Sequence, residues 1–355
     1  MSTSHVRPTL LGHQADQQWR AASDEAHPRK GRPAGLVPLV LAAVLAIAVI
    51  FVCFALPAAK STLNQVPLGV SGPPEAVSTV TAQLDRMAPN AWAARAYPDE
   101  AALEQAIRQR EVYGGLAVGA TGPRAMTASA ASPVVAQAVN SLAVGMGQQL
   151  GRPVPVTDLV GLPAGDPRGA GLAAAAFPLA LAGLLPAVLL ATAVPLRRRW
   201  QAVGLLSASA LSALVISSVL RFWFGSVEVN FWPVTGLIWL GLSAVGLFVL
   251  GCSALAGRVG MSAASALIML LGNPLSGLSS APEVLPAGWG AFGQLLPPGA
   301  LATALRSVAF FDGAGATRPL VILACWAAVG AALLWAGRPA RLAGAGHHQE
   351  ASPVS

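Results

Sequence analysis

Long apolar runs free of charged residues are the feature that most limits what this chain can fold into. A helix rises 1.5 Å per residue, so about 20 apolar residues cross the hydrocarbon core of a bilayer. Only 10% of the 355 residues are charged, which excludes an ordinary cytosolic enzyme. We predict an α-helical polytopic membrane protein with six transmembrane helices. They span roughly residues 36–57, 171–195, 201–220, 231–256, 260–281 and 319–337.

The first run allows two interpretations. Arg29, Lys30 and Arg32 precede it, as they would precede the apolar core of a signal peptide. The run is longer than such a core, however, and no clean small-x-small cleavage site follows. We therefore expect an uncleaved signal anchor.

The basic residues predict the orientation. They gather in the N-terminal tail (1–35), the turn Arg197–Arg199, at Arg258 and in the C-terminal tail (338–355). If the spans alternate, these segments share one side, and Lys and Arg favour the cytoplasm. We expect a multi-pass protein of the plasma membrane with both termini cytoplasmic. The whole net charge of +7 then lies on that face, where it indicates orientation and contact with anionic lipids rather than a nucleic-acid partner.

Between the first two spans lies an aqueous segment, 58–170, that predicts a small extracytoplasmic α/β domain. Apolar runs of strand type alternate in it with stretches of helical periodicity. The expected strands cover 66–70, 91–97, 112–118, 124–127 and 154–159. The expected helices cover 74–87, 98–110 and 133–150.

No catalytic or metal-binding constellation is found. Asp99, Glu100 and Glu104 are typical of a solvated helix N-terminus rather than of paired catalytic carboxylates. The inserted domain has no His, which excludes a Ser-His-Asp hydrolase there. The remaining candidates have plain interpretations: His347 and His348 as a solvated pair rather than a metal site, and Cys53, Cys252 and Cys325 as small buried apolar residues. We expect no enzyme activity and no cofactor or metal bound by this chain.

The outer loop, 282–318, is apolar in character. Leu301, Leu305, Val308 and Phe311 recur at helical spacing, and Arg306 lies off that stripe. We expect a re-entrant or interfacial segment that serves as an outer gate. The candidate gate residues are Trp289, Pro297, Pro298, Gly299 and Arg306. The alternative is a surface loop packed on the helices.

The spans carry no Asp, Glu, Lys, Arg or His at mid-depth, which argues against proton- or ion-coupled transport. A nucleotide-binding Walker A loop is missing as well, since Lys60-Ser61 lacks the glycine-rich turn. Uphill transport would therefore need a separate ATPase subunit carrying the ATP and Mg²⁺. Arg197, Arg198 and Arg199 are candidate residues facing it, unless they are only a topology signal.

Small residues recur four apart in the second and third spans. Such stripes let helices approach closely, within a bundle or at a dimer seam, although an Ala-rich chain also produces them by chance. The candidate seam consists of Gly183, Ala187, Ala191, Gly204, Ala208 and Ser212.

Three stretches resemble one family. They are Arg110-Glu-Val-Tyr-Gly-Gly115, Asp166-Pro-Arg-Gly169, and Leu296-Pro-Pro-Gly-Ala300 continuing through Ala304-Leu-Arg-Ser307 to Phe311-Asp-Gly313. The chain is similar in them to membrane subunits of type-2 ABC exporters, in particular the phage-infection-protein-like permeases of high-GC Gram-positive bacteria. The resemblance implies half-transporters that pair in the membrane, bind two cytoplasmic ATPase subunits and place re-entrant outer helices before the last span. It names a mechanism but no cargo, since the family's substrates include lipids, polymers, peptides and drugs.

The sequence thus favours the permease subunit of an ATP-binding-cassette exporter. It would pair as a homodimer or with a second permease and move a lipidic, polymeric or amphiphilic cargo outward by alternating access. The alternative is a non-transporting receptor or scaffold whose extracytoplasmic domain binds a ligand or an envelope partner.

Overall fold

The computed structural model describes residues 36–119, 122–192 and 197–337. The predictions for both tails, with their five His residues, lie outside this part of the chain. The chain divides into two units, one ending at Phe51 and one beginning at Val52. Helix α2 (Leu36–Ala59) crosses that boundary and covers the first predicted span. Its described apolar stretch, Val40–Ala55, is shorter than the length required of a spanning helix.

The inserted segment contains a mixed five-stranded sheet of order β2-β1-β3-β4-β5. The strands are β1 (Val66–Ser71), β2 (Trp92–Tyr97), β3 (Gly114–Gly119), β4 (Gly122–Thr127) and β5 (Val156–Asp158). β1 pairs in parallel with β2 and β3, β3 and β4 form an antiparallel hairpin, and β5 runs parallel to β4. Every strand expected from the sequence is present, with its ends moved by at most two residues.

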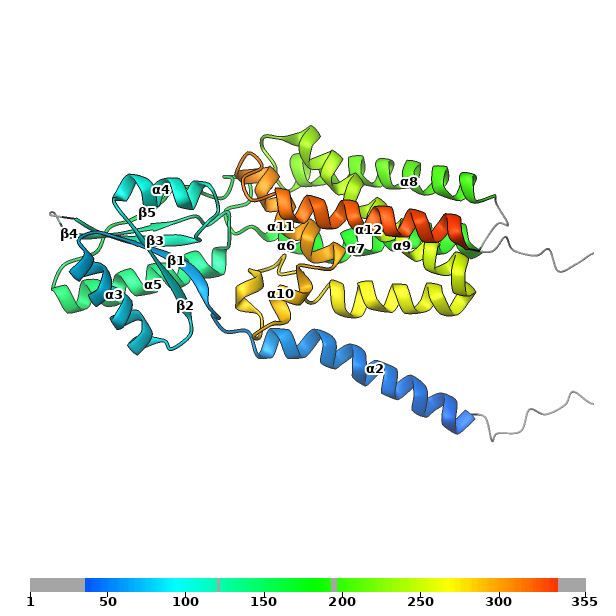
Figure 1. Ribbon diagram of the computed structural model, residues 1–355, viewed down its shortest axis with the longest axis horizontal. Coiled ribbons are helices and arrows are strands. Elements are labelled where there is room, and N and C mark those ends of the chain that lie inside the picture. The colour runs from blue at the N-terminus through cyan, green and yellow to red at the C-terminus, as the bar shows by residue number, and fades with distance from the viewer. Residues whose placement is uncertain (1–35, 120–121, 193–196, 338–355) are drawn as a thin grey trace, which may run out of the picture. The chain divides into compact units, whose positions relative to one another are not determined.

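Three helices cover this sheet: α3 (Pro74–Met87), α4 (Glu100–Arg108) and α5 (Pro133–Leu150). Their N-termini follow from local chemistry, because the Asp99 carboxylate accepts from the Ala102 N–H and the Ser132 hydroxyl accepts from the Val135 N–H. α4 packs on one face of the sheet, and α3 and α5 pack on the other (Figure 1).

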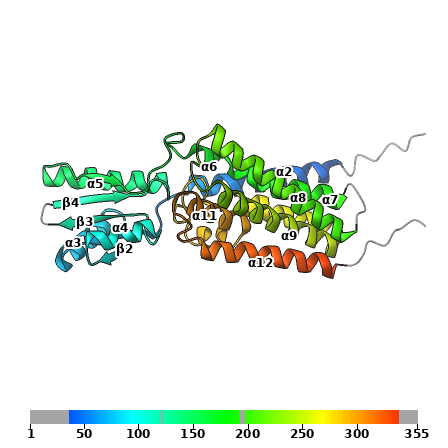
Figure 2. The ribbon, with the colours of Figure 1, turned by 90° about the horizontal axis from the view of Figure 1, so that it is seen from above.

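Four helices are long and apolar enough to cross a membrane. They are α6–α7 (Ala170–Ala174 and Ala176–Thr192), α8 (Arg198–Ser218, extended by a π-helical turn to Trp223), α9 (Phe231–Ala266, extended by the π-helical turn η3, Leu267–Gly272) and α12 (Thr317–Ala336). α9 contacts α7, α8 and α12, and Figure 2 shows these helices running lengthwise beside one another. The protein is therefore mostly helical, with a sheet and four candidate spans.

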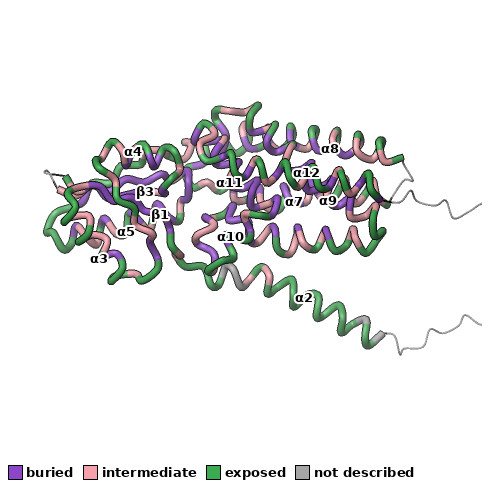
Figure 3. Tube along the Cα trace, viewed as in Figure 1, coloured by how far each residue is buried: buried purple, intermediate pink, exposed green. Residues whose placement is uncertain are grey.

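The outer loop is largely helical rather than irregular. A 3₁₀ turn (Pro282–Val284) precedes α10 (Trp289–Gly293) and α11 (Pro297–Phe310). α11 packs on α9 and α12 and buries ten residues. Figure 3 shows buried positions gathered in the sheet and around α11.

α9 is broken in the middle. As one straight helix, residues 231–272 would be about 63 Å long, twice the hydrocarbon core. Ala256 (φ −121°, ψ 15°) and Gly257 (φ 59°, ψ −138°) leave the helical region at the boundary predicted between the fourth and fifth spans. The second part returns, because Gly241 before the break and Gly272 after it both pack on α11, against Leu301 and Pro298.

The fifth predicted span is shorter than expected. Regular helix stops at Gly272 instead of continuing to 281, because Pro274 has no N–H to donate to the preceding turn and its ring disfavours the continuing helix. Gly277 then adopts φ 69°. Residues 273–281 form a partly buried, irregular connection to α10 and α11. We call this connection the 273–281 segment.

Gly257→Ala should destabilise the protein by about 1–3 kcal/mol, because a side chain at this φ and ψ is strained. Thermal unfolding in detergent micelles measures the effect. Gly236→Ala is the matched control on the same helix, where an added Cβ meets open space and φ is helical. Equal unfolding temperatures for both variants would contradict the assigned break.

Candidate functional site

The buried side chain of Arg306 binds the 273–281 segment. Its guanidinium donates to the carbonyl oxygens of Leu278 at 2.6 Å, and of Gly277 and Ser280 at 3.4 Å each. Arg306 is 6% exposed, so the expectation from periodicity that it lies off the packed stripe is wrong. The segment has no helix to satisfy these carbonyls, and a buried arginine supplies the missing donors.

Gln294 and Thr303 extend this network. Gln294 donates to the carbonyl of Ser276 at 3.1 Å and accepts from the Thr303 hydroxyl at 2.5 Å. The side chains after α10 and within α11 therefore hold the broken end of the fifth predicted span.

Arg110 joins the sheet domain to α11. It follows α4 in a left-handed conformation (φ 60°), and its Nη1 donates to the Thr303 carbonyl at 2.9 Å and the Ser307 hydroxyl at 2.6 Å. The guanidinium also lies 5.2 Å from the ring centroid of Phe311, within range of a cation–π contact. Burial lowers the pKa of Arg110, and nearby Tyr113 and Glu283 partly oppose that change. The side chain nevertheless stays charged at neutral pH.

A second contact lies between Tyr113 and Glu283. The Tyr113 hydroxyl donates to the Glu283 carboxylate at 2.7 Å. Burial, followed by the negative charge of Glu283, raises the pKa of Tyr113 above its ordinary value, so the phenol remains a donor. Nearby, the Thr62 and Asn64 N–H groups donate to the Val284 and Glu283 carbonyls.

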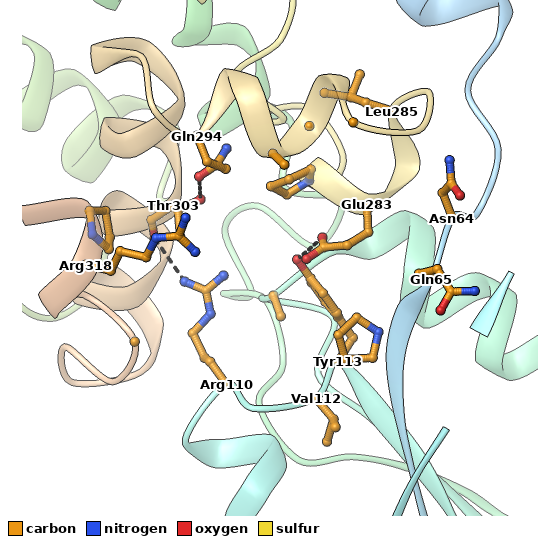
Figure 4. Close-up of a pocket in the computed structure, with 18 of the residues that line it drawn as sticks. Asn64, Gln65, Arg110, Val112, Tyr113, Glu283, Leu285, Gln294, Thr303 and Arg318 are labelled. Carbon is orange, nitrogen blue, oxygen red and sulfur yellow. Dashed lines mark hydrogen bonds between the residues drawn. The ribbon is translucent and has the colours of Figure 1, made fainter. Parts of the chain in front are cut away.

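Between these contacts lies a cavity of about 580 Å³. Figure 4 shows Arg110, Thr303 and Arg318 on one side and Glu283 with Tyr113 on the other. Apolar lining comes from Pro67, Val112, Leu285, Pro286, Pro319 and Ile322. A cavity of this size with a few converging polar groups is a candidate ligand site.

Asp166 forms a separate junction at the start of α6. Its carboxylate accepts from the N–H groups of Ala170 and Gly171 and from the Ser226 hydroxyl at 2.6 Å. The residue is 7% exposed. It caps α6 and ties the end of the inserted segment to the connection between α8 and α9.

The candidate gate residues lie around the same outer network. Trp289 is exposed on α10, and Pro297 is buried at the start of α11. Pro298 packs on Gly272, and Gly299 packs on the Gly293 carbonyl. Arg306 thus binds the 273–281 segment, Pro298 contacts the residue before it, and Gly299 contacts the end of α10. The gating role remains a prediction.

The three arginines before α8 differ in their contacts. Arg197 and Arg199 are exposed. Arg198 donates to the carbonyls of Trp335 and Gly337 at the end of α12. Arg198 therefore joins two helices, and the other two are free to face a partner.

The predicted seam residues lie at contacts within the chain. Gly183 packs on Val245 and the Leu242 carbonyl, Ala187 is buried, and Gly204 packs on Leu190. Ala191, Ala208 and Ser212 are half-buried. The buried stripe of α8 lies one residue later, at Leu205, Ser209, Ala213 and Ser217.

No metal-ligand cluster of three His, Cys, Asp or Glu residues occurs in the described part of the chain. The three cysteines are free thiols. Cys53 and Cys252 are half-buried and Cys325 is exposed, so the prediction that all three are buried is wrong. Comparisons with protein-family models, curated proteins and solved structures found no match.

The cavity does not follow from the sequence pattern, in which Arg110 and Tyr113 stand out only as parts of a resembling stretch. The available signal was Glu283, a carboxylate at the start of an apolar loop, since such a group requires a polar partner. Its partner is 170 positions away in the chain, and local patterns do not specify such a pair.

Arg110→Ala should lower the stability of the junction by about 2–3 kcal/mol, because charge-assisted hydrogen bonds are lost. Limited proteolysis with mass spectrometry should find faster cleavage in the contact region, in the residues of the sheet domain and of α11 that Arg110 holds together. Arg108→Ala is the matched control, since Arg108 is exposed and contacts the Leu159 carbonyl. Identical digestion of the two variants would contradict a role of Arg110 in holding the domain.

Proposed function

We propose that this chain is the permease subunit of an ATP-driven exporter that works with a separate ATPase subunit. The observation that supports this most is the chain of contacts from α9 through α11 to Arg110 and the sheet domain. It gives the spanning helices a direct mechanical connection to a folded aqueous domain. The resemblance adds support, because Arg110, Ser307 and Phe311 belong to two of the three resembling stretches and contact each other.

The proposed topology has six spans: α2, α6–α7, α8, the two parts of α9, and α12. It places the sheet domain outside the cell and both termini in the cytoplasm. The break at Ala256–Gly257 favours this arrangement, because it supplies a tight turn beside Arg258. The irregular 273–281 segment favours a re-entrant outer segment, because such backbone is tolerated at membrane depth only where protein satisfies it.

In the proposed mechanism, ATP binding in the partner changes the packing of the helices at the cytoplasmic side. α9 contacts α7, α8, α11 and α12, so a movement of α9 changes the position of α11. Arg110 then carries that movement to the sheet domain. Access alternates between the two sides, and an amphiphilic, lipidic or polymeric cargo leaves outward.

Exposed apolar faces support pairing with a second permease in the membrane. Leu211 and Val215 on α8 are 64% and 55% exposed. Lipid tails or a second copy of the chain would cover such faces.

The topology is tested by labelling single cysteines in a chain whose three native cysteines are replaced by alanine. Arg258→Cys should react with a membrane-impermeant maleimide only after the cells are opened. Asp312→Cys should react in intact cells, because it lies in the proposed outer loop. Reaction of both residues from the same side would overturn the six-span arrangement.

The transport role is tested by purifying the tagged chain from its native membrane in nanodiscs. An ATPase with a Walker A loop should co-purify, and its hydrolysis should rise when extracts containing the cargo are added. Repeated purification without any ATPase would count against an exporter.

Deletion of residues 62–165 separates the exporter from a receptor or scaffold. Loss of ATP-dependent export with the ATPase still bound supports a transport role for the sheet domain. Unchanged export, with loss of an external binding partner, supports the receptor instead.

A further inference from the structure

The cavity between the sheet domain and the outer helices carries an unused cationic group. Within the described residues, Arg110 donates hydrogen bonds through Nη1, to Thr303 and Ser307. Its other N–H groups are available to a ligand in the cavity that Arg110 lines. Arg318, an exposed residue on the same side in Figure 4, adds a second positive charge.

The opposite wall is arranged differently. The carboxylate of Glu283 accepts the Tyr113 hydroxyl through Oε2, and Oε1 has no partner within the described residues. In Figure 4 the Arg110 guanidinium lies between Arg318 and this pair, and Glu283 is close enough to act on the pKa of Arg110. An anion beside Arg318 is therefore separated from the carboxylate by the Arg110 guanidinium. A hydroxyl or ammonium group of the same ligand has an acceptor in Glu283.

Part of the lining is apolar. Leu285 and Pro286 come from the 282–318 loop, and Pro319 and Ile322 come from the first turns of α12. Val321, next to Ile322, is 56% exposed and is not part of the cavity lining. The Trp326 indole, one turn further along, donates to the Leu295 carbonyl at 2.8 Å and joins α12 to the end of α10. An apolar surface thus continues from the cavity onto a candidate spanning helix.

We propose that this cavity binds an amphiphile with an anionic headgroup, its anion held by Arg110 and Arg318 and its hydrocarbon chain lying over Ile322. The inference rests on the proposed function for the position of the cavity at the outer membrane surface, and it names the class of molecule handled there. A charged guanidinium pair selects the anion, and the apolar lining at the start of α12 selects the chain.

The proposal is tested with the full chain alone, in nanodiscs of phosphatidylcholine, without ATP or ATPase. Radiolabelled dodecyl phosphate should bind saturably. Arg318→Gln should weaken binding about tenfold, corresponding to one lost charged contact. Arg258→Gln, a change of the same kind at the break in α9, should leave binding unchanged.

A steric pair tests the location. Ile322→Trp fills the cavity and should abolish binding, whereas Val321→Trp, at the neighbouring exposed position, should not. Thermal unfolding checks that both variants fold. If Ile322→Trp does not fold, Arg318→Gln still tests the site, because Arg318 is exposed. Unchanged affinity in Arg318→Gln, or in a folded Ile322→Trp, would overturn the site.

Competitors test the chemistry. Displacement by dodecyltrimethylammonium as effective as by unlabelled dodecyl phosphate would overturn anion recognition. Equal displacement by inorganic phosphate would overturn the requirement for a hydrocarbon chain. This binding experiment contains no ATPase, so its result is independent of the co-purification test. Loss of binding would contradict the site but not the exporter. Failure to co-purify an ATPase would contradict the exporter but not the site.

Discussion

The outer part of the molecule depends on the guanidinium of Arg306, which donates to three carbonyls of the 273–281 segment. These carbonyls would be satisfied if the helix continued, but Pro274 ends it. An unsatisfied buried carbonyl costs about 1–3 kcal/mol, so three of them would cancel what the burial of a few apolar side chains contributes. The cation is in turn stabilised by carbonyl dipoles, without a carboxylate. Arg306 and the irregular segment therefore require each other.

Arg110 is the second arginine of this region, and it joins the sheet domain to α11. Both arginines bind carbonyl or hydroxyl oxygens, whereas the ion pair of the described residues, Arg124 with Glu100 at 3.7 Å, is exposed. Guanidinium groups do not titrate near neutral pH, and buried contacts are weakly screened by salt. The junction is thus insensitive to ordinary changes in pH and ionic strength. α11, the 273–281 segment and the sheet domain are expected to move as one body.

The parts of this arrangement that could be predicted are those set by local chemistry. Asp99 and Ser132 mark helix starts, the alternation of strands and helices gives the sheet, and a glycine beside Arg258 marks the break in α9. Periodicity misplaced Arg306, because it assumes that a charged residue on an apolar helix faces water. Hydrophobicity alone also extended the fifth span beyond Asn273, since the residues after the proline are still apolar. The contact of Tyr113 with Glu283 is set by tertiary packing.

The contacts between the spanning helices are of a different kind from those at α11. Four buried serine hydroxyls have no hydrogen-bond partner within the described residues: Ser209 and Ser217 on α8, and Ser243 and Ser265 on α9. The Trp239 indole of α9 donates to the Leu206 carbonyl of α8 at 3.0 Å. Apart from that bond, small side chains and unpaired hydroxyls give the α8–α9 contact little specific bonding to break when it shifts. The α9–α11 contact, in comparison, adjoins the network of Arg306, Gln294 and Thr303. If the helices rearrange during transport, the shift should therefore occur between α8 and α9, with α11 following α9.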